Sequence, residues 1–400
     1  MCKPNLYKIK TMSLRRVVTS LVAMVVICTS LSAQTIYNAH THDQIPYKPV
    51  TSQEPEQHQH EFTDINILES TTVEDQGRSG TCWAFGALSV MQSDLMRQGI
   101  KNVNLSEMWI VRNMYYEKVV KYIRLHGNLH LSIGGAMHDV TEGVRRYGVV
   151  PEAVYQGMNY GEDFHTLGEL DAVLKGFADA IIKNENGRLS MAWATALNLI
   201  LDSYFGPRPA TFFVEGVEHT PLSYAKALRL DMDDYIFVTS YTHHPYEEDI
   251  ILEIPDNWLW RSAYNMPIKE MMEVLDHSLE SGYTVGCAVD ITETGFSAQN
   301  NEASLTVHSG VDNWERITPR RQDEFDSYIT TDDHCMQIVG TAKSNHGTPC
   351  YKLKNSWGIR IPNSGFLYMT REYIEVKSLI FMVNRKALPA SLQKKIGVKN

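Results

Sequence analysis

The stretch Gln76-Gly77-Arg78-Ser79-Gly80-Thr81-Cys82-Trp83-Ala84-Phe85 places a cysteine at the start of an apolar segment. The spacing of that segment predicts a helix from residue 82 to about residue 97. Unpaired N–H groups and the positive dipole at a helix N-terminus favour the thiolate of a cysteine, which is its nucleophilic form. Gln76 stands six positions earlier, and the small residues between them let its amide and the Cys82 N–H converge on one oxyanion. The alternative is a buried, unreactive thiol.

Two residues far along the chain could serve that thiol. His334 precedes an apolar segment, 336–342, that is typical of a strand, and Asn355 ends the alternating segment 350–354. An asparagine carbonyl oxygen can accept a hydrogen bond from one imidazole nitrogen and leave the other facing a thiol. Trp357 would keep water away from that contact. Together these residues favour a catalytic Cys82 over a buried one.

In the order Gln, Cys, His, Asn, these positions resemble the active site of the papain-like cysteine peptidases. Ser79 stands where the papain signature has its first cysteine, and 252 residues separate Cys82 from His334, against about 130–150 in the papain branch. Both features are similar to the aminopeptidase C and bleomycin hydrolase branch, which has a long insertion before the histidine. The resemblance runs from about residue 70 to about residue 390. It implies an α+β, papain-like fold in which a helical lobe faces an antiparallel, β-barrel-like lobe.

The resemblance also implies a role for each matching residue. Cys82 would be the nucleophile, His334 the base, Asn355 the residue that orients the base, and Gln76 an oxyanion donor. Two further pairs would assist them, glycines that hold an extended substrate by backbone hydrogen bonds and supporting tryptophans: Gly134 and Gly135, and Trp83 and Trp357. Peptides or proteins would be the substrates, and this chemistry needs no metal or organic cofactor.

The N-terminus is predicted to be a targeting segment. Residues 1–33 contain a basic pair, an apolar core of about a dozen residues and a small-residue exit, which is typical of a secretory signal peptide cleaved after Ala33. We therefore expect a secreted or periplasmic protein. The core is short for an uncleaved membrane anchor, and bulky Ile27 disfavours lipid attachment at Cys28.

Residues 34–65 are expected to form a polar N-terminal arm, and residues 66–400 the peptidase domain with an insertion at about 155–265. The arm contains four histidines, but no carboxylate or cysteine array completes a metal site among them: His40, His42, His58 and His60. Periodicity predicts helices and strands in both parts of the domain. The helices are 105–125, 136–147, 167–182, 191–204 and 268–279, and the strands are 235–240, 284–290, 336–342, 350–354 and 365–370.

Composition limits the partners. The net charge of −10 and the absence of a basic run after the N-terminus disfavour nucleic acid and, once the signal is removed, an anionic membrane. Cys335 and Cys350 could pair or remain free thiols. His243-His244-Pro245 is interpreted as a turn rather than a metal-ligand pair.

The end of the chain bears on the choice of scissile bond. In the branch that this chain resembles, a C-terminal arm lies in the cleft and restricts cleavage to N-terminal residues. Residues 383–389 resemble the segment before that arm, but the sequence then ends after a few residues. This suggests a more open cleft and endopeptidase or oligopeptidase action as the alternative to aminopeptidase action. A catalytically silent binding protein is a further alternative, and the hexamers formed by relatives make a homo-oligomer possible.

Overall fold

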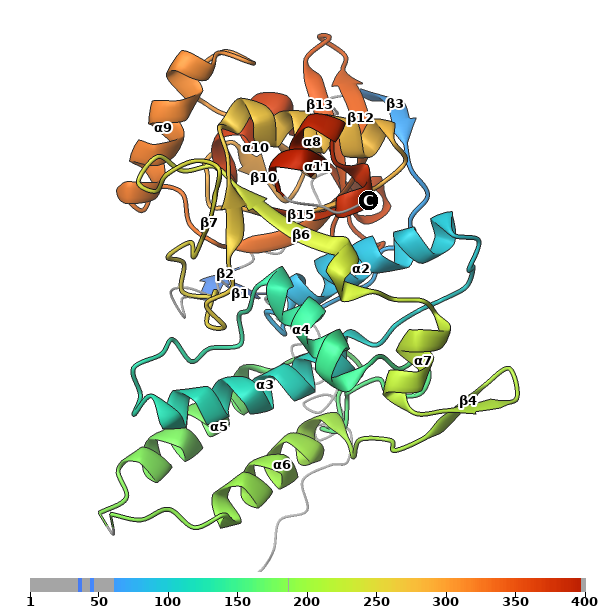
Figure 1. Ribbon diagram of the computed structural model, residues 1–400, viewed down its shortest axis with the longest axis vertical. Coiled ribbons are helices and arrows are strands. Elements are labelled where there is room, and N and C mark those ends of the chain that lie inside the picture. The colour runs from blue at the N-terminus through green and yellow to red at the C-terminus, as the bar shows by residue number, and fades with distance from the viewer. Residues whose placement is uncertain (1–34, 38–43, 47–60, 186, 397–400) are drawn as a thin grey trace, which may run out of the picture.

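The computed structural model describes residues 35–37, 44–46, 61–185 and 187–396. The predicted signal peptide, its predicted cleavage site and the four arm histidines lie outside these residues. A helical half packs against a half built on a large sheet, and the long helix α2 (Cys82–Arg97) lies between them (Figure 1). None of the described helices has the length and apolarity that crossing a membrane requires.

The helical half is assembled around α2. Twelve of the thirteen residues from Trp83 to Leu95 carry side chains, and all thirteen are buried, so this helix is core on every face. It begins and ends where the apolar spacing predicts. The other helices of this half are α3 (Glu107–Arg124), α4 (Met137–Tyr147), α5 (Gly168–Ile182), α6 (Ala192–Phe205) and α7 (Pro221–Ala227).

The other half is built on an eleven-stranded sheet with the order β10-β11-β14-β13-β12-β9-β15-β6-β8-β7, in which β3 also pairs with β12. Its strands are β3 (Phe62–Ile67), β6 (Tyr235–Thr239), β7 (Glu248–Ile250), β8 (Ala263–Asn265), β9 (Val285–Val289), β10 (Phe296–Ser297), β11 (Glu302–Ala303), β12 (His334–Ser344), β13 (Pro349–Lys354), β14 (Phe366–Thr370) and β15 (Ser378–Asn384). Four helices accompany it, namely α8 (Ile268–Glu280), α9 (Trp314–Asp326), α10 (Arg371–Lys377) and α11 (Ala390–Lys395).

Short elements complete the described chain. Two hairpins lie outside the main sheet, β1 (Thr35–Tyr37) with β2 (Gln44–Pro46), and β4 (Phe212–Val214) with β5 (Val217–His219). Single turns of 3₁₀ helix are η1 (Met232–Asp234), η2 (Pro362–Gly365) and η3 (Arg385–Ala387).

Two expected boundaries differ from the element positions. The arm was expected to reach residue 65, yet β3 starts at Phe62 and pairs with β12, with Thr63 opposite Lys343. The insertion was expected to run to about residue 265, yet β6 and β8 belong to the main sheet because β6 pairs with β15. The segment 155–265 therefore begins with helices of the helical half and ends with strands of the main sheet.

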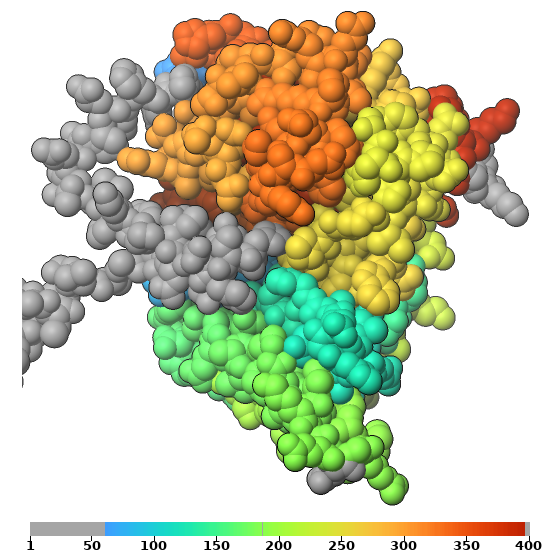
Figure 2. Space-filling view, turned by 90° about the vertical axis from the view of Figure 1, so that its left-hand side faces the viewer, coloured from blue at the N-terminus to red at the C-terminus, as the bar shows by residue number. Residues whose placement is uncertain are grey.

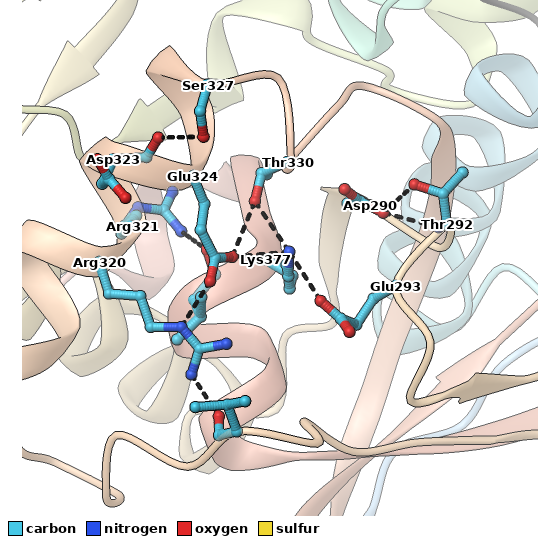
Figure 3. Close-up of polar contacts among 12 residues, drawn as sticks. Asp290, Thr292, Glu293, Arg320, Arg321, Asp323, Glu324, Ser327, Thr330 and Lys377 are labelled. Carbon is cyan, nitrogen blue, oxygen red and sulfur yellow. Dashed lines mark hydrogen bonds and ion pairs between the residues drawn. The ribbon is translucent and has the colours of Figure 1, made fainter.

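A buried ion-pair cluster fixes the loop that leads into β12 (Figure 3). The Lys377 side chain is fully buried, and its Nζ lies 2.7 Å from Glu324 and 3.0 Å from Glu293. The same ammonium donates to Thr330 Oγ1 at 3.3 Å, and Asp290 accepts from the backbone N–H of the next residue, 331, at 2.9 Å. These bonds hold residues 330–331, three positions before His334.

Removing the ammonium should cost more than removing an exposed one. We expect Lys377→Ala to lower the free energy of unfolding by about 3–5 kcal/mol, because it leaves two carboxylates without their shared cation. Lys175→Ala is the control, since its exposed pair with Asp179 on α5 contributes about 0.5 kcal/mol or less. Urea unfolding of both variants measures the difference. Equal losses would contradict the anchoring role of Lys377.

Candidate active site

The loop before α2 brings Gln76 and Cys82 into one place. Gly77 and Gly80 have positive φ angles of 57° and 63°, and a Cβ on Gly77 would lie 2.4 Å from the carbonyl oxygen of His165. Ser79 donates to the Gln76 carbonyl at 2.7 Å. Only glycine fits at position 77, and Ser79 closes the turn that contains it. This is the physical reason for the small residues in the motif.

Cys82 is the first residue of α2 and is partly exposed, whereas Trp83 beside it is buried. At this position the backbone N–H groups have no partners within the helix. The helix N-terminus expected for the thiol is therefore present. Cys82, Cys287, Cys335 and Cys350 are all free thiols, so Cys335 and Cys350 do not pair.

His334, Asn355 and Trp357 come together at the adjoining end of the sheet. His334 Nε2 lies 2.7 Å from Asn355 Oδ1, and both residues are buried. The imidazole and indole ring centroids are 5.1 Å apart, so Trp357 covers this contact. Since Nε2 faces the amide, Nδ1 is left for the thiol, and Cys82 and His334 are hydrogen-bonded.

Ser356, which was not among the residues singled out from the sequence, positions Gln76. Its hydroxyl donates to Gln76 Oε1 at 2.6 Å, and its carbonyl accepts from the Gln76 backbone N–H at 2.8 Å. Because the amide oxygen is occupied, the NH₂ end of Gln76 is the end available as a donor. The serine's place between Asn355 and Trp357 was the only signal of this role.

A second thiol contacts the first. The Cys335 side chain hydrogen-bonds to Cys82, and this bond is the largest cause that lowers the pKa of Cys82 well below its ordinary value. Burial opposes the shift, and the charge of His334 supports it. The pKa of Cys335 is raised well above its usual value by the same bond. Burial alone would lower the pKa of His334, but the thiolate and the Asn355 bond outweigh it and raise that pKa. Both shifts favour the thiolate and imidazolium forms of this pair.

Gly134 and Gly135 lie just before α4, packed too tightly for any side chain. A Cβ on Gly134 would lie 2.2 Å from Asp256 Oδ2, and one on Gly135 would lie 2.8 Å from the Trp83 ring. The Gly134 carbonyl accepts from Lys118. Among the described residues, neither backbone group of Gly135 has a hydrogen-bond partner. Trp83 thus supports a backbone edge that a peptide could pair with.

His243 and His244, interpreted as part of a turn, meet Glu253 on the surface. Their Nε2 atoms lie 3.1 and 2.8 Å from its two oxygens. These groups are close enough to share an ion. However, Gln322 donates to His243 Nδ1 at 2.9 Å, so His243 Nε2 carries the proton that it donates to Glu253. Hydrogen bonds from this turn to Glu253 and to Gln322 on α9 account for the cluster.

Loss of the second thiol should change the ionisation of the first. The Cys335 S–H donates to the Cys82 thiolate and so stabilises its charged form. We expect Cys335→Ala to raise the pKa of Cys82, moving the midpoint of its alkylation by iodoacetamide to higher pH. Cys350→Ala, a buried thiol bonded to a backbone carbonyl elsewhere, is the control. An unchanged midpoint in Cys335→Ala would contradict the assigned contact.

Known proteins resemble the chain in both sequence and structure. The chain is 24% identical to aminopeptidase G of Lactobacillus delbrueckii subsp. lactis over 380 residues, covering 82% of this chain and 84% of the relative. It is 22% identical to bleomycin hydrolase of Gallus gallus over 376 residues, covering 80% and 82%. The crystal structure of PepW from Lactobacillus rhamnosis HN001 matches with a TM-score of 0.66 at 22% identity over 84% of each chain, which confirms the papain-like α+β fold.

A family model matches two stretches that make up most of the chain. The model described as the Peptidase C1-like family matches residues 27–181 and 214–399. The unmatched residues, 182–213, contain α6. The chain belongs to the Peptidase C1-like family and is a cysteine peptidase of the aminopeptidase C branch.

Proposed function

We propose that this protein hydrolyses peptide bonds with Cys82 as nucleophile, His334 as acid and base, and Asn355 as the group that orients the imidazole. The observation that carries the proposal is the continuous hydrogen-bonded chain from the Cys82 sulfur through His334 to Asn355. Thiol nucleophiles of this kind require a partner base held in a single orientation by a third group.

The reaction follows from the charges of this pair. The Cys82 thiolate attacks the peptide carbonyl, and the Cys82 N–H and the Gln76 amide stabilise the oxyanion. The His334 imidazolium gives its proton to the leaving amine, so a thioester remains on Cys82. Neutral His334 then takes a proton from water, whose oxygen attacks the thioester. Release of the acid restores thiolate and imidazolium. No step requires a cofactor.

Aminopeptidase action, as in the named relatives, is the first candidate for the site of cleavage. An open cleft that also accepts internal bonds is the second, because the described C-terminal residues lie away from the thiol. In α11, Leu392 is buried against the sheet half, and Lys395 pairs with Glu247 and Glu270. Fluorogenic peptides with free and with acetylated N-termini distinguish the two. Absence of turnover for every acetylated peptide would exclude the open cleft.

Secretion is part of the proposal and rests on residues 1–33. N-terminal sequencing of the protein expressed in a bacterium with an outer membrane should begin at Gln34. Intact protein in the cytoplasm would contradict it. Self-association stays a prediction, which light scattering tests.

Labelling separates the peptidase from a catalytically silent relative. We expect a thiol-directed epoxide to modify Cys82 in the folded, reduced protein and not in Cys82→Ala. Failure of Cys82 to react would favour the silent binding protein.

The oxyanion donor should affect turnover rather than substrate binding. We expect Gln76→Ala to lower kcat by about 10²–10³-fold with little change in KM, as for loss of one oxyanion donor. Ser356→Ala should lower kcat less, since the amide remains but can rotate. Gln98→Ala, at the far end of α2, serves as the control. A loss confined to KM would contradict the oxyanion role.

A further inference from the structure

A small pocket lies next to the reactive thiol. It begins directly after Gly134 and Gly135 and is bordered by residues on both sides of His334. The residues that line it include Ala136, Met137, Ala288, Asp332, Cys335 and Ile380. Cys335 also contacts the Cys82 sulfur. A peptide whose carbonyl reaches Cys82 and whose backbone follows the two glycines therefore directs the group that precedes the attacked residue into this pocket.

Asp332 is the carboxylate of this pocket, and it has no partner. Its exposed fraction is 8%, and among the described residues no donor or cation contacts it. The neighbouring acids do have partners. Asp333 accepts from Thr331 Oγ1 at 2.7 Å, and Asp290 accepts from the backbone N–H of the same threonine. Asp332 is thus an exception within a well-bonded loop.

The surroundings of Asp332 are negative. Burial raises its pKa well above the ordinary value, and Asp256, the Cys82 thiolate, Asp333 and Asp139 each add to that shift. The His334 imidazolium two residues away is already paired with the Cys82 thiolate.

Two further basic side chains near the pocket, His138 and Lys118, do not neutralise Asp332. His138 also lines it, but burial lowers the pKa of His138 to about 4, so this ring is neutral. Its ring stacks on Phe237, and its Nε2 bonds to the Ser262 carbonyl. Lys118 donates to the carbonyls of Ser132 and Gly134.

The loop that carries Asp332 is held in place. Thr330 bonds to Lys377, as Figure 3 shows. The backbone N–H of Thr331 donates to Asp290, and His334 bonds to Asn355. Asp332 therefore stays at the wall of the pocket, and the penalty for a buried negative charge favours its protonated form, as its raised pKa indicates. A cation delivered into the pocket would remove that penalty.

We propose that Asp332 binds a positively charged nitrogen of the substrate, so that this peptidase selects peptides with a cation just before the attacked residue or on its amine. The proposal rests on the peptidase function above. The cation has two possible sources: the free α-ammonium of a peptide N-terminus, or a lysine or arginine side chain on the residue before the attacked one. Either source presents the same N–H donors to the same carboxylate.

Five fluorogenic amides test the proposal and separate the sources. They are alanyl, acetyl-alanyl, norleucyl-alanyl, acetyl-norleucyl-alanyl and acetyl-lysyl-alanyl amides. We expect kcat/KM of the wild-type protein to be at least tenfold higher for one or more of the charged amides than for its neutral counterpart. Preference for alanyl or norleucyl-alanyl identifies the α-ammonium, and preference for acetyl-lysyl-alanyl identifies the side chain.

Asp332→Asn, which keeps the shape and removes the charge, should abolish that preference, so that the ratio of kcat/KM for the charged amide to that for its neutral counterpart falls to about one. Asp323→Asn, an exposed acid on α9, is the matched control and should retain the preference. Equal kcat/KM for charged and neutral amides in the wild-type protein, or a preference that survives Asp332→Asn, would overturn the proposal.

A binding measurement keeps this test separate from the proposed function. In the Cys82→Ala variant, calorimetry should show tighter binding of the preferred charged peptide amide than of its neutral counterpart, and Asp332→Asn should equalise them. Wild-type protein that cleaves none of the amides and resists the epoxide would refute the peptidase function. Cleavage without preference for a charge would refute only the role of Asp332.

Discussion

The contact between the first turn of α2 and the first residues of β12 is the constraint on which the site depends. It places a thiol from the helical half within hydrogen-bonding reach of an imidazole from the sheet half. Gly86, one turn after Cys82, permits this approach, because a Cβ there would lie 3.2 Å from the Cys335 carbonyl. A second connection joins the halves where Ser356 bonds Gln76 through backbone and side chain. The proposed nucleophile, base and oxyanion donor are thus held by the same interface.

Electrostatics make this interface reactive. Thiolate and imidazolium stabilise each other in a buried setting, where charge interactions are stronger than in water. The acidic side chains around Asp332, by contrast, make a further negative charge there unfavourable. A peptide that brings a cation would relieve this imbalance, which is the physical basis of the proposed preference for positively charged substrates.

The sequence predicted what depends on local pattern. The helix at Cys82–Arg97 follows from apolar periodicity, and the partners His334 and Asn355 follow from a resemblance whose motifs lie on strand ends. Cys335 was not predicted to contact Cys82, because adjacent strand residues usually face opposite sides. The role proposed for Asp332 could not be predicted from the sequence, because only the structure shows that no donor or cation contacts this side chain among the described residues. The strands β6 and β8 were assigned to an insertion because their pairing with distant β15 is not visible in local periodicity.

The ionisation state of Cys82 is the most direct test of this account. A pH titration of thiolate ultraviolet absorbance, taken as the difference between the wild-type protein and Cys82→Ser, reports that state alone. We expect the thiolate absorbance of Cys82 to rise at a pH well below the ordinary cysteine pKa of about 8.5. His334→Ala should move this rise to higher pH, because it removes the imidazolium. A rise at or above the ordinary value in the wild-type protein would contradict the thiolate–imidazolium pair.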